Sequence, residues 1–289
     1  MIETFGASDA HALQALTQAV GWPHTLADWQ DFLALGAVIG HRDANGVPHT
    51  CSGLYQYGSV LSSIGVVVVR PEWRGRGLGR AVTQRCIDAS TAEVLSLIAT
   101  PFGLPVYERM GFQTISTVHR MMGELNVAAL PARRPHAAAT SITSTELPAI
   151  IALEAKTYGA SRDALLRRLH RRTLAAQMLC GSGPERSDAP GRDSSPRAFG
   201  FALQKIDHVH IGPVIAPDVD SAAAVIAALA NAVKSRVRID VPHHQHELRD
   251  LLLAAGLNEK SADPVMTMHG VPLPGDRTTS FGIAFQAYG

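Results

Sequence analysis

The sequence has little of several features that mark particular classes of protein. It has only three cysteines, Cys51, Cys86 and Cys180, and their odd number and wide spacing argue against a disulfide framework. The net charge is only +1, so no charge excess points to nucleic acid or to an anionic membrane as a partner. No basic leader with an apolar stretch opens the chain, and no apolar run reaches membrane-spanning length. We therefore expect a soluble cytoplasmic protein with reduced thiols.

What the chain does have is size and clear punctuation. Its 289 residues, 46% of them hydrophobic, are enough for two ordinary domains with their own cores. Over the first 125 residues, the pattern predicts two helices, three strands, a helix, a strand, a short helix and a final strand. Thr25 and Asp28 are spaced as a capping box at the start of the second helix. The order predicts an α/β class with a mixed, mostly antiparallel sheet flanked by helices.

The stretch VVVVRPEWRGRGLGRAV, residues 66–82, joins a run of valines to a glycine-rich loop. Pro71 ends the strand because proline cannot donate to a sheet, and Gly75, Gly77 and Gly79 follow without side chains. Backbone N–H groups at the start of the next helix can then point at a phosphate, and the helix dipole favours that anion. We interpret the loop as a pyrophosphate cradle, with a flexible basic turn as the alternative. The glycine spacing fits neither the dinucleotide-binding pattern nor the P-loop.

Two motifs here resemble those of the GNAT superfamily of acyl-CoA-dependent N-acyltransferases. The phosphate-loop pattern of that family, Arg/Gln-x-x-Gly-x-Gly/Ala, is matched by Arg74, Gly77 and Gly79 in RGRGLG. Further along, ATPFGLPVYERMGF resembles the family segment in which a tyrosine stands four residues before Gly-Phe, here Tyr107 before Gly111. The two motifs occur in the family's order and on the expected elements. The resemblance covers roughly residues 1–125.

The resemblance implies an N-acetyltransferase that uses acetyl-CoA and needs no metal. The strand before the loop would part from its parallel neighbour, so that the pantetheine arm binds its exposed backbone as an added strand. A backbone N–H of that strand would stabilise the oxyanion formed from the thioester carbonyl, by about 3 kcal/mol. Tyr107 would protonate the departing thiolate as a general acid. Thr100 is a departure, because many members have an asparagine there that contacts the pantetheine arm. The implied cofactor-binding residues are Val67, Val68, Val69, Arg74, Gly75, Arg76, Gly77, Leu78, Gly79, Arg80 and Gly103.

The acceptor side is less well defined by the sequence. In the resembling fold the first two helices cover the acceptor pocket, so Trp22, His24 and Trp29 are candidate substrate contacts, with packing as the alternative role of both tryptophans. No carboxylate lies on the strand before the glycine loop, and His24, Asp28 and His49 are the remaining candidates for a general base. The predicted reaction is direct attack of a primary amine of a small molecule on the acetyl thioester. The alternatives are a protein or peptide acceptor, or a non-catalytic acyl-CoA-binding sensor or partner-binding protein.

The second half of the chain repeats the first. The segments IGPVIAPDVDSAAAVIAALANAV and VRIDVPHHQHELRDLLLAAGL match IGVVVVRPEWRGRGLGRAVTQRCI and LSLIATPFGLPVYERMGF. We predict an N-terminal catalytic GNAT domain, residues 1–129, and a C-terminal GNAT-like domain, residues 141–289, with a linker near residues 130–140. A Gly/Ser/Pro/Arg-rich insertion at residues 181–197 is predicted to be a mobile loop.

The two copies differ in chemistry. The second copy has no glycine loop, and it places Asp218 and Asp220 where a pyrophosphate would lie, so that like charges oppose binding. Leu252 stands at the position that matches Tyr107. We expect the second copy to be catalytically inactive and to complete the acceptor pocket, as a second subunit would. The chain would then be a pseudo-dimeric monomer or a homodimer.

Four histidines of the second copy raise the question of a metal site. His208 and His210 share one face of a predicted strand, and His243 and His246 stand one helical turn apart. Their spacing matches no established zinc pattern, and polar residues at the ends of strands and helices are usually solvated. We therefore expect no metal.

Overall fold

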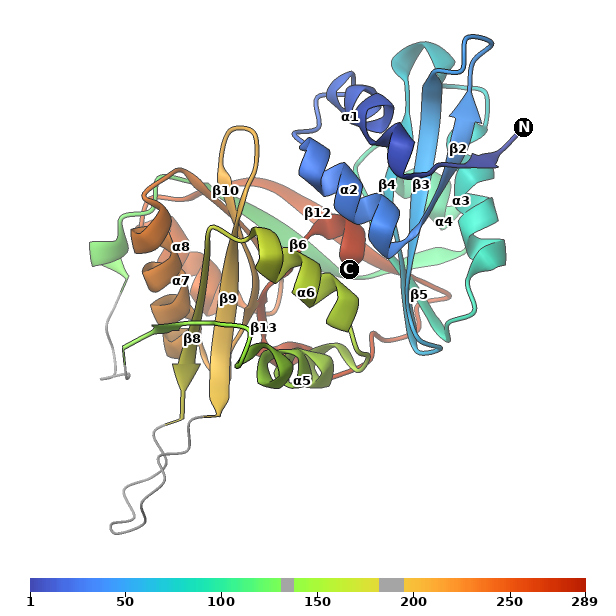
Figure 1. Ribbon diagram of the computed structural model, residues 1–289. Coiled ribbons are helices and arrows are strands. Elements are labelled where there is room, and N and C mark those ends of the chain that lie inside the picture. The colour runs from blue at the N-terminus through green and yellow to red at the C-terminus, as the bar shows by residue number, and fades with distance from the viewer. Residues whose placement is uncertain (131–137, 182–194) are drawn as a thin grey trace.

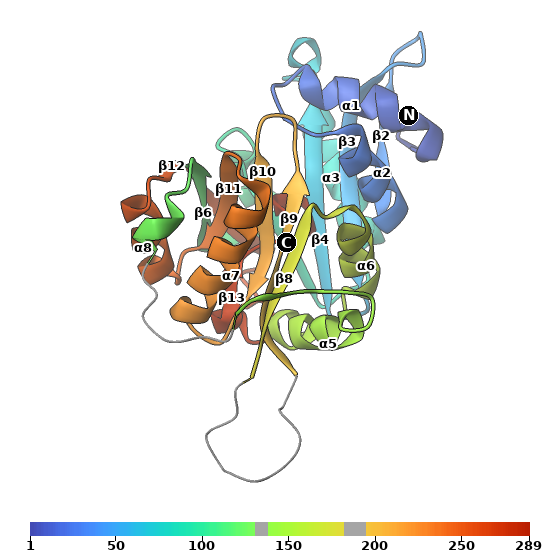
Figure 2. The same cartoon turned by 60° about the vertical axis from the view of Figure 1, so that its left-hand side comes forward.

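The chain folds around one large mixed sheet against which helices pack (Figures 1 and 2). The structure is a computed structural model that describes residues 1–130, 138–181 and 195–289. Within these residues, 13 strands form one sheet in the order β1-β2-β3-β4-β5-β12-β6-β11-β10-β9-β8-β7, and β13 pairs with β10. The predicted class, a mixed sheet with flanking helices, is confirmed.

The N-terminal half contains the predicted elements in the predicted order. Its helices are α1 (Ala10–Gln18), α2 (Leu26–Leu35), α3 (Leu78–Ala89) and α4 (Leu104–Glu108). Its strands are β1 (Glu3–Thr4), β2 (Ala37–Arg42), β3 (Pro48–Tyr57), β4 (Leu61–Val69), β5 (Val94–Ile98) and β6 (Phe112–Gly123). The capping box of α2 is confirmed, because Thr25 Oγ1 accepts a bond from the Asp28 N–H (3.1 Å) and the Asp28 carboxylate accepts one from the Thr25 N–H (2.9 Å).

The C-terminal half repeats this order. Its helices are α5 (Leu147–Tyr158), α6 (Asp163–Arg172), α7 (Val219–Val233) and α8 (His246–Ala254). Its strands are β7 (Thr140–Ser141), β8 (Ala175–Cys180), β9 (Pro196–Gln204), β10 (Val209–Ile215), β11 (Val237–Pro242), β12 (Asn258–Met268) and β13 (Ser280–Gly282). Equivalent glycines even share a backbone conformation, since φ is +97° at Gly111 and +98° at Gly256, a region that favours glycine.

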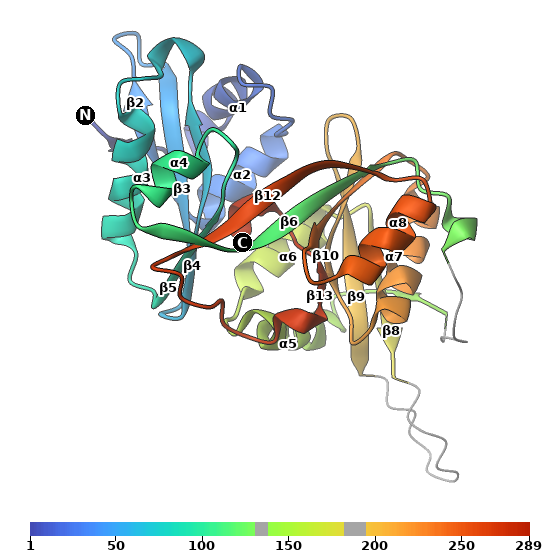
Figure 3. The ribbon, with the colours of Figure 1, turned by 180° about the vertical axis from the view of Figure 1, so that it is seen from behind.

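The two halves exchange their last long strands. β12 lies between β5 and β6, with Val265 opposite Ile98, and β6 pairs in turn with β11, where Arg120 lies opposite Asp240. Figure 3 shows β6 and β12 running side by side through the middle of the molecule. Each final strand therefore flanks the parallel strand pair of the other half. The division into residues 1–129 and 141–289 stays a prediction from the repeat, and the exchange joins both halves into one sheet.

A single apolar core also crosses from one half to the other. Leu13 and Trp29 of the first half and Ile150 and Phe199 of the second belong to one cluster of buried side chains. Burial of apolar surface is worth roughly 25 cal/mol per Å², so the shared cluster stabilises the arrangement of the halves as well as each half itself.

The segment after β13 connects the two halves at the centre of the sheet. Ile283 N–H donates to the Asp240 carbonyl of β11 (3.0 Å), and Ser63 Oγ of β4 donates to the Ala287 carbonyl (3.2 Å). The segment is further held by Arg162, whose Nη1 donates to the Gly289 carbonyl (3.0 Å). Arg162 is fully buried in an ion pair with Glu154, which is equally buried.

The structure also bears on the predictions for the cysteines, for membrane-spanning helices, for the linker and for the mobile loop. The three cysteines are free thiols, and Cys51 and Cys86 are buried. Among the described residues, no helix combines the length and apolarity needed to cross a membrane. Most of the predicted linker and of the predicted mobile loop, residues 131–137 and 182–194, lies outside the described residues.

Candidate functional site

The parallel strands β4 and β5 part halfway along their length. They pair only from Leu61–Ile64 on β4, opposite Val94–Leu97 on β5, so the backbone of β4 beyond Gly65 has no parallel neighbour. At this point Val66 adopts φ +47°, a strained conformation for a β-branched residue, within a register shift against β3. Strain of this kind gathers at functional sites and costs about 1–3 kcal/mol. The splayed strand that the valine run predicts is therefore present.

The glycine loop that follows β4 leaves a row of donors open. Gly75 and Gly77 have φ of +76° and +73°, and Gly77 directly precedes α3. In the described chain, the N–H groups of residues 75–80 donate to no backbone carbonyl, and the first helical bond runs from Ala81 N–H to the Gly77 carbonyl. A Cβ at Gly75 or Gly77 would meet no atom within 4 Å, so the backbone conformation and not space requires glycine there. Open N–H groups at a helix N-terminus suit a phosphate.

The arginines of the loop lie on its outside. Arg74 Nε donates to the Val69 carbonyl (3.2 Å), and an Arg76 Nη donates to the Glu72 carbonyl (3.3 Å). Both side chains are exposed and basic, as Arg80 is at the start of α3. Their charges add to the attraction for an anion at the loop.

Tyr107 lies on α4 and faces the splay. Its side chain is buried (8% exposed), and its ring packs edge-on against Phe112. Gly103 allows this position, since a Cβ there would lie 2.6 Å from the tyrosine ring. Burial raises the pKa of Tyr107 well above its usual value near 10, so the phenol stays protonated at neutral pH. A buried neutral phenol beside the splay is equipped to donate a proton.

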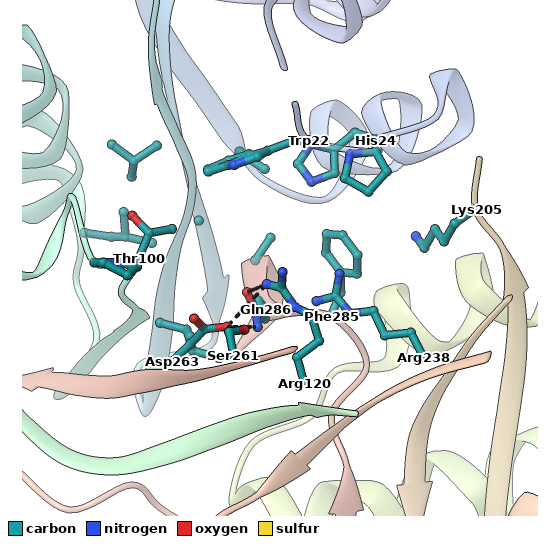
Figure 4. A pocket seen from close by; sticks show the side chains of 18 of the residues that line it. Trp22, His24, Thr100, Arg120, Lys205, Arg238, Ser261, Asp263, Phe285 and Gln286 are labelled. Carbon is teal, nitrogen blue, oxygen red and sulfur yellow. Dashed lines mark hydrogen bonds and ion pairs between the residues drawn. The ribbon is translucent and has the colours of Figure 1, made fainter. Parts of the chain in front are cut away.

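A pocket of about 260 Å³ opens at the splay and extends into the second half (Figure 4). Of the predicted residues, Trp22, His24, Val67 and Tyr107 line it. Trp29 does not line it; it is fully buried and donates through Nε1 to Thr17 Oγ1 (3.0 Å), in keeping with the alternative role in packing. Val68, Val69, Gly103 and the loop residues from Arg74 to Arg80 also lie outside the pocket lining.

The three candidates for a general base have other surroundings. Asp28 pairs with Lys205 (2.6 Å) and Arg172; burial alone would raise its pKa, but these two cations hold it well below the usual range. His49 stacks on Trp73 beside the glycine loop. His24 lines the pocket, and burial lowers its pKa to about 3, so it is neutral at physiological pH.

Sequence reasoning missed the polar wall of the pocket. This wall consists of Arg120 on β6, Lys205 after β9, Arg238 on β11, and Ser261 and Asp263 on β12. Asp263 is 5% exposed, and its Oδ2 accepts bonds from Ser261 Oγ (2.9 Å), Gln286 Nε2 (2.9 Å) and an Arg120 Nη (3.3 Å). Among the described residues that line the pocket, Asp263 is the one carboxylate. No local signal marks these positions, because the strand exchange brings them together.

Comparisons with known proteins identify the family. Two family models, each described as an acetyltransferase (GNAT) domain, match residues 51–125 and 150–282. A curated relative from Bacillus subtilis (strain 168), named as the uncharacterized N-acetyltransferase YitH, is 29% identical over 258 residues, covering 88% of this chain and 86% of that protein. The chain belongs to the GNAT acetyltransferase superfamily.

Solved structures share the fold of this tandem GNAT acetyltransferase. A putative acetyltransferase from Pyrococcus horikoshii aligns with a TM-score of 0.78 and 16% identity, covering 100% of this chain and 95% of that one. A tandem GNAT protein from the clavulanic acid biosynthesis pathway aligns with a TM-score of 0.66 and 13% identity, covering 95% and 99%. The predicted family, the tandem arrangement and the assignment as an acyltransferase enzyme are confirmed.

The second GNAT copy has the equivalent of the splay, but the chain fills it. β10 pairs with β11 only at Val209 and His210, and β13 then pairs with β10 where the strands separate. Asp218 caps α7 by accepting a bond from the Ser221 N–H (2.7 Å), so a carboxylate already occupies this helix start. Leu252, at the position of Tyr107, is fully buried. These features support the expectation that the second copy is catalytically inactive.

The four histidines of the second copy lie apart. His208 bonds to Asp207 through Nδ1 (2.7 Å), and His210 bonds to the Ile283 carbonyl through Nε2 (3.2 Å). His243 pairs with His119 (2.9 Å), and His246 lies at the start of α8. In the part of the chain that the structure describes, no three His, Cys, Asp or Glu side chains are grouped to hold a metal ion.

Proposed function

We propose that this GNAT acetyltransferase transfers an acetyl group from acetyl-CoA to the primary amine of a small molecule. One observation carries the proposal: a single pocket joins the open backbone of β4 and the Tyr107 ring to a charged wall that both halves supply. A donor thioester and an acceptor amine can meet there without leaving the protein.

The donor is held by the first half. The open N–H groups of residues 75–80 bind the pyrophosphate, and the unpaired backbone of β4 bonds to the pantetheine amides. The bulge at Val66 directs a backbone N–H toward the thioester carbonyl, where the oxyanion develops; one such donor contributes about 3 kcal/mol.

The proton movements use two side chains of the pocket. Asp263 binds the acceptor's ammonium group and takes up one of its protons, which frees the nitrogen lone pair to attack the carbonyl carbon. The carbon–sulfur bond then breaks, and Tyr107 gives its proton to the departing thiolate. The second proton lost from the nitrogen restores the Tyr107 phenol and Asp263 passes its proton to water, so that the products are an N-acetyl amide, free CoA and one proton.

The size of the pocket favours a small acceptor. Its volume of about 260 Å³ lies just below the usual range of about 300–1,000 Å³ for ligand pockets, and side chains of both halves surround it. The second copy then serves as the wall of the acceptor site, and the acyl-CoA site of the first copy is the one that works.

A thiol-release assay over a panel of amines tests the proposal. Purified protein and acetyl-CoA should release CoA faster when an acceptor amine is present, and calorimetry should detect acetyl-CoA binding. Asp263→Asn should lower kcat by about a hundredfold while acetyl-CoA affinity stays unchanged. The matched control is Asp207→Asn, which removes an exposed carboxylate beside the pocket and should leave kcat unchanged. Binding of acetyl-CoA without acceleration by any amine would count against the proposal.

A further inference from the structure

From the polar wall of the pocket we infer that the acceptor amine also carries an anionic group, a carboxylate or a phosphate, which Arg120 and Arg238 bind. The inference rests on the proposed function and narrows its substrate class. It starts from the order β11, β6, β12 in the sheet, which sets Asp240, Arg120 and Ser261 in one row. Arg238 lies two residues from Asp240 on the same strand face, diagonal to Arg120.

Figure 4 shows both guanidinium groups directed toward the same part of the pocket, with His24 and Phe285 nearby and Lys205 on the side away from Thr100. The pKa of Arg120 is lowered by burial and, next, by the charge of Arg238, as expected of two cations close together. Two guanidinium groups that converge in a partly buried place form strong charge-assisted hydrogen bonds to an anion placed between them.

Each arginine has donors left for such an anion. Arg238 donates through Nε and one Nη to the carboxylate of Asp240 (2.8 and 2.6 Å), so its other Nη remains to donate to an anion. Arg120 donates through one Nη to Asp263 and Gln286, and its Nε is buried without a hydrogen-bond partner among the described residues. A buried guanidinium N–H without an acceptor is unfavourable, and an anion bound in this place supplies the acceptor.

The lining of the pocket holds more cations than carboxylates. Of the described residues that line it, Arg120, Lys205 and Arg238 are cations and Asp263 is the one carboxylate, while Asp28 and Asp240 pair with Lys205 and Arg238 from outside the lining. Lys205 and Arg238 are 4% and 7% exposed, so water screens their charges poorly.

Asp263 adds a negative group to the wall that carries the two positive guanidinium groups. Its Oδ2 takes every bond that the carboxylate makes to the described side chains, so Oδ1 remains for an ammonium group. A molecule that has an amine at one end and an anion at the other matches this wall, whereas a simple alkylamine leaves the Nε of Arg120 without an acceptor.

Matched acceptors test the inference. β-Alanine is compared with its amide and with propylamine, and ethanolamine phosphate with ethanolamine, so that the two series distinguish a carboxylate from a phosphate site. We expect kcat/KM for the anionic member of at least one series to exceed that of its neutral partner by about tenfold to a hundredfold. In Arg120→Gln this ratio should fall to about one, and Arg120→Lys should restore part of it. General damage to the site would instead lower both members equally and leave the ratio unchanged.

The outcomes separate this inference from the proposed function. Acetylation of the neutral and anionic acceptors at equal rates would overturn the inference and leave the proposed function standing. If no amine is acetylated, the proposed function fails, and a binding experiment still tests the inference. N-acetyl-β-alanine or acetyl phosphate should raise the melting temperature of the wild type, whereas the amide of N-acetyl-β-alanine should not. The Arg120→Gln variant should show no rise with either anion. No shift with either anion in the wild type would overturn the inference as well.

Discussion

Replacing Tyr107 by phenylalanine removes one oxygen atom from the pocket and little else. The ring keeps its contact with Phe112 and its place over Gly103, where a side chain would not fit. We therefore expect the free energy of unfolding to change by about 1 kcal/mol or less. The hydroxyl is the only group that the substitution removes, so a change in kcat reports on the hydroxyl.

The kinetic effect should be much larger than the structural one. General acid catalysis by a positioned side chain contributes about 10²–10⁴-fold, so kcat of Tyr107→Phe should fall at least about a hundredfold, equivalent to about 2.7 kcal/mol in the barrier. The dissociation constant for acetyl-CoA should stay within about threefold of the wild-type value, because the proposed contacts to the cofactor are backbone groups of the loop and of β4. Thiol release under saturating substrates gives the first quantity, and calorimetry gives the second.

Tyr55→Phe is the matched control, since it makes the same chemical change at a buried tyrosine outside the pocket whose hydroxyl has no hydrogen-bond partner among the described residues. It should leave kcat unchanged. Because burial raises the pKa of Tyr107, the acid form persists, and wild-type kcat should not decline through its ionisation below about pH 10. Equal losses of kcat and affinity in Tyr107→Phe, or an unchanged kcat, would refute the assigned role.

Three further predictions concern the loop, the core and pH. Gly77→Ala should destabilise the fold by about 1–2 kcal/mol, because φ is +73°, and should weaken acetyl-CoA binding severalfold in calorimetry, whereas unchanged affinity would argue against the cradle. Arg162→Met should destabilise by about 3–5 kcal/mol in denaturant titrations by leaving Glu154 buried without its partner, and adding Glu154→Leu should recover most of the loss. Burial lowers the pKa values of His24 and His210 to about 3, so unfolding takes up protons between pH 6.5 and 3. The free energy of unfolding should therefore be constant above pH 6.5 and fall below it by about 1.4 kcal/mol per pH unit per histidine, and a constant value from pH 7 to 5 would contradict this.

The two copies differ at the point where their parallel strands separate. β13 fills the gap between β10 and β11 that in the first copy is left open between β4 and β5. The residues after it reach Gly65, where a Cβ would lie 2.5 Å from the Ala287 backbone, so that the second half forms part of the floor of the first half's pocket. The second half also supplies Arg238 and Asp263 to the lining of this pocket.

Much of the part of the site proposed to bind acetyl-CoA could be predicted from local sequence. The helices and long strands of the first half, the capping box at Thr25 and the glycine loop before α3 depend on interactions over a few residues, and all were predicted. The splay needed the resemblance as well, because a run of valines is equally compatible with an ordinary buried strand. Trp22 and Trp29 show the limit, since both were candidates for the pocket and only the position of α2 against the core separates them.

By itself, then, the sequence determined the order of elements, the repeat, the conformation of the loop before α3 and the presence of Tyr107 beside it, because these features are encoded within short stretches. Only the tertiary structure decided the acceptor side. Arg120, Arg238 and Asp263 meet because β12 pairs with β5 and β6 with β11, and such a choice of partner depends on contacts across more than a hundred residues of chain. In the strands themselves these side chains are ordinary alternating polar residues, and the exchange of strands makes them the wall of one pocket.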